Sequence, residues 1–163
     1  MKRLLVWVPV MLVAASAAAC RHIPRQSDIQ QPSTQVTVLS FGMPDGGTIE
    51  AKADLLVFSK SGLSTKVESL EATLYVKGTA VGKGRTEDGA WIPSLDSKVF
   101  TLEFEDLDVA GLEKALGRVL GQGAIETFEV DGVIVYETQE GALQQPFPKS
   151  SISCYLGPKG TRT

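Results

Sequence analysis

The sequence predicts a mainly β fold, an antiparallel β-sandwich with one short helix, from three observations. Apolar and polar residues alternate along several short segments between residues 36 and 147, as they do in strands that bury one face. Turn residues separate these segments at short intervals, which favours antiparallel neighbours. One stretch, around residues 109–120, has its apolar residues at helical spacing instead.

The expected strands follow one another along the chain, and each ends at a turn. Residues 49–58 alternate most clearly, and Lys77-Gly78 has the sequence of a hairpin tip. Gly132 is expected to form a β-bulge, and Pro146 and Pro148 to close the last edge strand. About seven strands with one helix are typical of an immunoglobulin- or fibronectin-like sandwich. The strands are expected at residues 36–41, 49–58, 70–77, 79–87, 99–104, 128–136 and 143–147.

The one expected helix lies between the strands at 99–104 and 128–136 and reaches Leu120. Acidic residues before it complement the helix dipole, and the glycines Gly121 and Gly123 after it end the helix. Its apolar stripe is expected to plug one end of the sandwich or to cover a crossover. The stripe consists of Val109, Leu112, Leu116, Val119 and Leu120.

The N-terminal residues have the features of an export signal. Lys2 and Arg3 precede an apolar run, residues 4–19, which is shorter than the roughly 20 residues that cross a bilayer. The run ends in small residues, as signal peptides do at their cleavage site. It is followed at once by Cys20, and this arrangement resembles the lipobox of bacterial lipoproteins, although Ala17 replaces the usual leucine. An ordinary secretory signal and a retained membrane helix are the alternatives, and we favour acylation of Cys20.

The remaining chain divides into three parts after a signal peptide at residues 1–19. Residues 20–34 are polar beyond Cys20 and lack apolar periodicity, so we expect a lipidated cysteine followed by a flexible tether. Residues 35–148 are expected to form one β-sandwich domain, and residues 149–163 a polar C-terminal tail.

The two cysteines, Cys20 and Cys154, have two possible fates. If Cys20 is acylated, Cys154 has no partner and the domain has no disulfide bond. If cleavage leaves Cys20 as a free thiol, an oxidising compartment favours a bridge between the two. Cys154 has no base or cationic residue near it in the sequence, so we expect it to be inert.

Charge argues against nucleic acid as a partner. Without residues 1–19 the chain has 14 basic and 19 acidic residues, a net charge of −5. It therefore has no basic surplus with which to neutralise phosphates.

Residues that carry out chemistry are scarce in this sequence. His22 is the single histidine, so the domain has no histidine for a catalytic triad and too few for a multi-histidine metal site. Residues 78–84 resemble a phosphate-binding loop only in part. There is one residue too few between the glycines, and no Ser or Thr follows Lys83. A glycine-rich hairpin explains them better. We therefore expect no catalytic residue, no cofactor and no metal.

An acidic cluster at residues 103–108 is the one group that raises other possibilities. It lacks the spacing of a calcium loop, and strand-exposed acids that lead into a helix explain it. A hydrolase that uses Glu103 or Glu105 is the least favoured of the functions considered.

The order and spacing of these elements resemble the water-stress and hypersensitive-response (WHy) domain of the folded, hydrophobic late-embryogenesis-abundant proteins. The resemblance extends from about Val36 to Phe147, and it departs from the family at Ser59–Gly62, where the family usually has Asn-Pro-Asn. It implies a fibronectin- or immunoglobulin-like sandwich, no catalytic residues and a loose link to desiccation or envelope stress. The matching segments are residues 55–58, 74–78, 82, 92–94, 99–104, 112–120, 128–132 and 145–147.

Together these features predict a non-enzymatic envelope protein that is anchored to a membrane through acyl chains on Cys20 and binds protein or lipid partners. Arg21 gives no inner-membrane retention cue of the enteric kind, so we expect the periplasmic face of the outer membrane. The alternative function is a periplasmic carrier that holds an apolar ligand or lipid between its sheets, with the helix at 112–120 as a lid.

Overall fold

A computed structural model of the chain describes residues 22–42, 49–117 and 123–156. The predicted signal peptide and Cys20 lie outside these residues, and so do Val119 and Leu120 of the predicted helix. Within them are eight strands, one α-helix and one short 3-10 helix, η1 (Gln26–Asp28). The strands are β1 (Ser33–Gly42), β2 (Ile49–Phe58), β3 (Thr65–Val76), β4 (Thr79–Thr86), β5 (Ala90–Ile92), β6 (Ser97–Leu107), β7 (Ala124–Thr138) and β8 (Gly141–Leu156).

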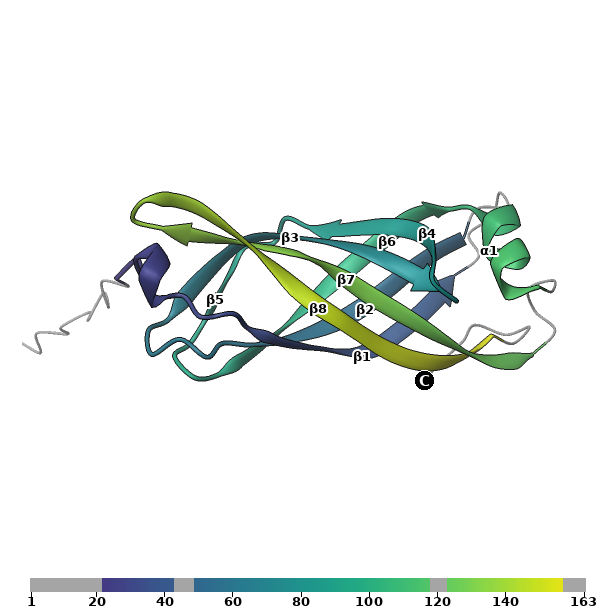
Figure 1. Cartoon of the computed structure of the whole chain (residues 1–163), viewed down its shortest axis with the longest axis horizontal. Coiled ribbons are helices and arrows are strands. Elements are labelled where there is room, and N and C mark those ends of the chain that lie inside the picture. Colours follow the sequence, from purple (N-terminus) through teal and green to yellow (C-terminus); the bar gives the residue numbers. More distant parts are fainter. Residues whose placement is uncertain (1–21, 43–48, 118–122, 157–163) are drawn as a thin grey trace, which may run out of the picture.

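All eight strands belong to one antiparallel sheet. Its order is β1-β2-β6-β4-β3-β7-β8, and β5 pairs with β3 beside this path. The sheet curls until its edge strands β1 and β8 lie next to each other, nearly closed into a barrel (Figure 1). The Val36 amide of β1 donates to Ser150 Oγ of β8 at 2.8 Å, so a side chain joins the two edges.

The predicted mainly β fold with one short helix is confirmed. Its division into the two separate sheets of a sandwich is not confirmed, because β4 connects both halves. This strand pairs with β3 from Leu70 to Val76, but with β6 only through Gly84 and Arg85. The pairing between β4 and β6 is therefore short.

The inward faces of the strands form one apolar core. In β2, Ile49, Ala51, Ala53, Leu55 and Val57 are all buried, and the residues between them are more exposed. This is the two-residue alternation that the sequence shows. Full burial stabilises each large apolar side chain by about 1.5–3 kcal/mol, so the core is the main source of stability.

Three glycines allow close approaches within the sheet. A Cβ at Gly84 would lie 2.7 Å from the Phe104 ring, and one at Gly82 would lie 2.1 Å from Leu107 Cδ2. Gly82 and Gly84 therefore make room for core side chains of β6, and the interpretation of residues 78–84 as a hairpin is confirmed. Gly132 stands at the predicted bulge, where the β7–β8 register shifts.

The helix α1 (Val109–Leu116) lies at one end of the sheet (Figure 1). Leu112 and Leu116 face the core, and Lys77 Nζ donates to the Leu116 carbonyl at 2.9 Å. The helix ends earlier than predicted, because Gly117 adopts a left-handed conformation (φ 72°) in which its amide reaches the carbonyls of Glu113 and Lys114.

The last strand is longer than predicted. We expected it to end at Phe147 and a polar tail to follow, but β8 continues to Leu156. Pro146 and Pro148 do not stop it, because β8 is an edge strand. The Pro146 carbonyl accepts a hydrogen bond from Gln31, so the backbone polar atoms of this proline face away from β7. The absence of an N–H there removes no bond of the ladder.

Candidate functional site

The N-terminal segment, residues 22–32, is attached to the end of the sheet opposite α1 (Figure 1). Gln139, in the β7–β8 turn, donates its amide to the Pro24 carbonyl at 3.0 Å and its side-chain nitrogen to the Ile23 carbonyl at 2.7 Å. The Gln26 amide donates to Glu140 Oε2 at 2.9 Å. These bonds hold the start of the described chain against the hairpin.

The second half of this segment is fixed by burial. Pro24, Ile29 and Pro32 are buried, and the Gln30 amide donates to Ser61 Oγ at 3.0 Å. The expectation of a flexible tether over residues 20–34 is therefore wrong for residues 22–34. Backbone groups of the segment form hydrogen bonds with neighbouring loops, and its few buried apolar residues pack against the domain.

Cys20 precedes the first described residue, His22, by two positions. Two peptide units span at most about 7 Å. A lipid attached to Cys20 would therefore hold this end of the sheet close to the bilayer. Within the described ranges, no helix is long and apolar enough to span a membrane.

Loops from three parts of the chain meet at this end around Ser61. Ser59 and Ser61 are buried in the turn between β2 and β3, where the WHy family usually has Asn-Pro-Asn. The Ser61 carbonyl accepts from the Leu95 amide at 3.2 Å and from Ser94 Oγ at 3.4 Å. With the bond from Gln30, this turn joins the N-terminal segment to the β5–β6 loop.

Two exposed leucines lie on the loops at this end. Leu63 follows the Ser59–Gly62 turn and is 40% exposed, and Leu95, in the β5–β6 loop, is 62% exposed. Leu95 has a φ of 53°, an uncommon backbone conformation for a leucine. Neither leucine could be identified from the sequence, since single apolar residues in loops give no periodic signal.

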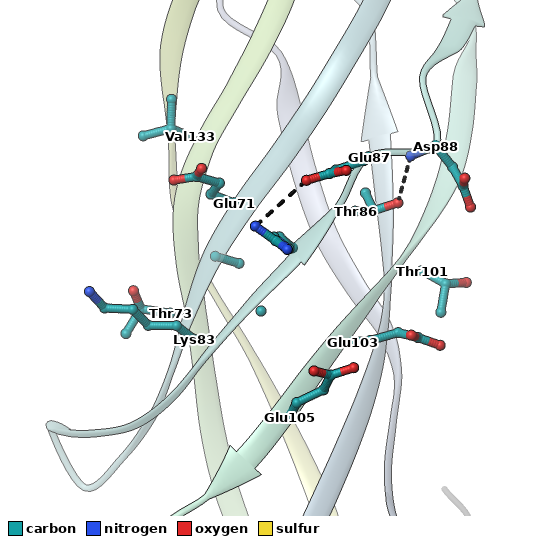
Figure 2. A pocket seen from close by; sticks show the side chains of 13 residues that line it. Glu71, Thr73, Lys83, Thr86, Glu87, Asp88, Thr101, Glu103, Glu105 and Val133 are labelled. Atoms are coloured by element: carbon teal, nitrogen blue, oxygen red, sulfur yellow. Dashed lines mark hydrogen bonds and ion pairs between the residues drawn. The ribbon is translucent and has the colours of Figure 1, made fainter.

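Outside the sheet, a polar hollow of about 790 Å³ lies over β3, β4 and β6 (Figure 2). Lys83 and Arg85 of β4 face a larger number of acidic side chains, so the hollow is acidic. Arg85 forms an ion pair with Glu87 at 3.6 Å, with both side chains largely exposed, and such a surface pair contributes little to stability. The acidic lining residues are Glu71, Glu87, Asp88, Glu103 and Glu105.

The acids considered for hydrolysis, Glu103 and Glu105, follow one another along β6 at this hollow (Figure 2). Glu103 is 54% exposed and accepts a hydrogen bond from Lys52 Nζ at 2.6 Å. This hydrogen bond and the charge of Glu103 raise the pKa of Lys52. A general acid instead needs apolar surroundings that keep its proton, so this geometry gives no support to acid catalysis.

Cys154 is buried at the opposite end from the N-terminal segment. It is 1% exposed and unbonded, and burial raises the pKa of its thiol to about 11. Cys154 pairs with Glu126 across β7, while residues 22–24 lie by Gln139, so roughly 40 Å of strand separates them. A disulfide needs Cα atoms within about 7 Å. The alternative of a Cys20–Cys154 bridge within one chain is therefore out of reach.

His22 is exposed, and its Nε2 lies 3.2 Å from Gln139 Nε2. Among the described residues, no three His, Cys, Asp or Glu side chains are grouped so that they could hold a metal ion.

Comparison with known proteins identifies the fold. No protein-family model and no curated protein matches the sequence. The solution structure of AT1g01470 from Arabidopsis thaliana is similar, with a TM-score of 0.62 and 16% identity over 79% of this chain and 84% of that one.

Two further structures are more distant. That of a candidate late embryogenesis abundant protein, At2g46140.1, has a TM-score of 0.48 and 13% identity over 80% of this chain and 74% of that one. A crystal structure from Archaeoglobus fulgidus has a TM-score of 0.45 and 13% identity over 77% of this chain and 96% of that one. The chain thus shares the fold of the first Arabidopsis protein.

Proposed function

We propose that this chain is a non-enzymatic protein of the bacterial cell envelope, anchored to a membrane by acyl chains on Cys20. The position of Cys20 carries the proposal. It follows the small residues 14–19 directly and precedes by two residues a segment that is fixed to one end of the sheet. Each buried methylene contributes about 0.8 kcal/mol, so more than one chain gives stable attachment.

The location that we propose is the periplasmic face of the outer membrane. Arg21 follows the acylated cysteine, and it is not the aspartate that retains enteric lipoproteins in the inner membrane.

A role in desiccation or envelope stress, exerted by binding protein or lipid, completes the proposal. It depends on the resemblance of residues 36–147 to the WHy domain. We regard the sheet as a variant of the immunoglobulin- or fibronectin-like sandwich in which β4 joins the two halves through its short pairing with β6.

Packing of the interior favours this role over that of an apolar carrier. Large side chains such as Leu39, Leu74, Phe104 and Phe128 are fully buried in one continuous cluster. The helix α1 adds Leu112 and Leu116 to that cluster, as part of the core rather than as a lid over a slot. The hollow over β4 is polar and lies on the outer face of the sheet.

Metabolic labelling with a clickable fatty acid tests the proposal. The wild-type protein should be labelled and sediment with the membrane fraction, and the Cys20→Ala variant should lose the label. A Cys154→Ala variant is the control and should keep it, because this thiol is buried. An unlabelled wild type, or a label that survives Cys20→Ala, would show that the proposed anchor is wrong.

A further inference from the structure

We infer that the end of the sheet where the N-terminal segment is attached lies on the lipid bilayer, with Leu63 and Leu95 inserted among the headgroups and upper acyl chains. This inference rests on the proposed acylation of Cys20. It goes beyond it by assigning a surface of the folded domain to the membrane.

The two leucines and the N-terminal segment share one end of the molecule. The β5–β6 loop that carries Leu95 and the β2–β3 turn that precedes Leu63 are hydrogen-bonded to each other through Ser61. The Gln30 amide binds the same serine. The loops that carry the two leucines are therefore joined to the segment that follows Cys20, at the end opposite α1 (Figure 1).

Leu95 and its apolar neighbours would gain free energy by leaving water. Leu95 has a left-handed backbone conformation, which costs free energy. With 62% of its surface exposed, burial within the protein does not offset that cost. Phe58, at the end of β2, and Val99, near the start of β6, are further exposed apolar residues toward this end. Insertion into the acyl region would remove such surface from water, a favourable transfer.

The short distance between Cys20 and this end of the sheet identifies the bilayer as the surface that covers the two leucines. His22 lies at Gln139 in the β7–β8 turn, and Cys20 is two residues away. Acyl chains on Cys20 would keep this end within a few ångströms of the headgroups, at an effective concentration that no soluble partner has. A second, weaker contact beside a lipid chain is also how many anchored proteins are held stably.

The contact is apolar rather than electrostatic. The acidic residues here, Asp28, Asp96 and Glu140, each accept a hydrogen bond from a backbone amide of the same region. They equal in number the basic residues Arg25, Lys60 and Lys98 of this end, so anionic lipid gains no advantage. We therefore expect the insertion in neutral and anionic vesicles alike.

The opposite end supplies a matched control. Ile125 is 72% exposed and lies across from Tyr155 on the β7–β8 pair, near α1. It resembles Leu95 in size and exposure, but roughly 45 Å of strand separates it from Gln139, where the N-terminal segment is attached.

The test places an environment-sensitive NBD fluorophore on the acylated protein, purified from membranes and reconstituted in phosphatidylcholine vesicles with or without phosphatidylglycerol. One sample carries the label at Leu95→Cys and the other at Ile125→Cys. Cys20 is blocked by its acyl chains and Cys154 is buried, so the engineered thiol is the site that reacts. Flotation of the vesicles reports the anchor separately.

We expect both proteins to float with the vesicles, the label at position 95 to shift to the blue and be quenched by nitroxide-bearing lipid, and the label at 125 to do neither. Flotation with both labels in water, or with both equally shifted, would overturn the inference and leave the anchor standing. A blue shift of the label at position 95 that occurs only in anionic vesicles would contradict an apolar, charge-independent insertion. Failure of the wild type to float would refute the anchor, and the inference with it.

Discussion

Ser61 shows how much a single buried hydroxyl contributes at the end of this sheet. Its oxygen accepts from the Gln30 amide, and its carbonyl accepts from Leu95 and Ser94. The Ser61→Ala variant should lose about 1–2 kcal/mol of unfolding free energy, since the amide of Gln30 is left without its partner. Urea denaturation measures this change.

The control for this change is Ser151→Ala, an exposed position in β8. It should alter the free energy of unfolding by less than about 0.5 kcal/mol. Equal stability of the two variants would contradict the role assigned to Ser61.

Gly132 is required by a close approach of backbone to backbone. A Cβ at this position would lie 1.9 Å from the Glu71 carbonyl oxygen. The Gly132→Ala variant should therefore destabilise the fold by about 3 kcal/mol, because a backbone atom cannot move aside as a side chain can. At Gly62 a Cβ meets nothing within 4 Å, so thermal unfolding of Gly62→Ala should stay near that of the wild type. A tolerated Gly132→Ala would refute the bulge geometry.

Because Cys154 is buried, the free energy of unfolding should fall at high pH. Burial raises the pKa of its thiol from 9.0 to about 11, so the neutral form is favoured in the folded state. The stabilisation is present below pH 9 and is lost as the pH rises through 11, by up to about 3 kcal/mol. Unfolding free energies measured across this range should fall in the wild type and fall less in Cys154→Ala. A flat profile in the wild type would contradict burial of the thiol.

At the scale of elements, residues 22–32 behave as part of the domain. Backbone amides of Gln30 and Gln139 donate to groups across this junction, so hydrogen exchange there should be slower than in an unstructured segment. Native-state exchange read by mass spectrometry checks this. Exchange over residues 22–32 at the rate of a free peptide would restore the flexible tether that the sequence predicted.

Some elements were predictable because local chemistry determines them. The alternation of residues 49–58 corresponds to β2, Lys77-Gly78 forms the β3–β4 turn with both residues at positive φ, and Gly132 marks the bulge. Each depends on a two-residue period or on a backbone conformation that few residues adopt. The start of the helix followed from the 3.6-residue period, but its end at Gly117 did not.

Other elements depend on tertiary contacts that the sequence does not reveal. Pro146 and Pro148 suggested the end of a strand, yet β8 continues because it is the edge strand of the ladder, with no further strand paired to its outer side. Residues 22–32 have no periodicity, and their order comes from hydrogen bonds to Gln139, Glu140 and Ser61. The leucines of the candidate membrane surface were missed for the same reason.

At the scale of the whole molecule, the two ends of the curled sheet differ. One end is closed by α1, whose Leu112 and Leu116 complete the core. The other receives the N-terminal segment and exposes Leu63 and Leu95. The proposed acyl chains on Cys20 would place the second end at the membrane, while the acidic hollow lies on the outer face of the sheet over β3, β4 and β6.

We propose above all that this sheet is attached to a bilayer through acyl chains on Cys20. Intact-mass and N-terminal peptide spectrometry of protein extracted from membranes tests it most directly. We expect a mature chain that begins at Cys20 and carries acyl chains on that residue. A chain that begins at any other residue, or a Cys20 with an unmodified thiol, would contradict it.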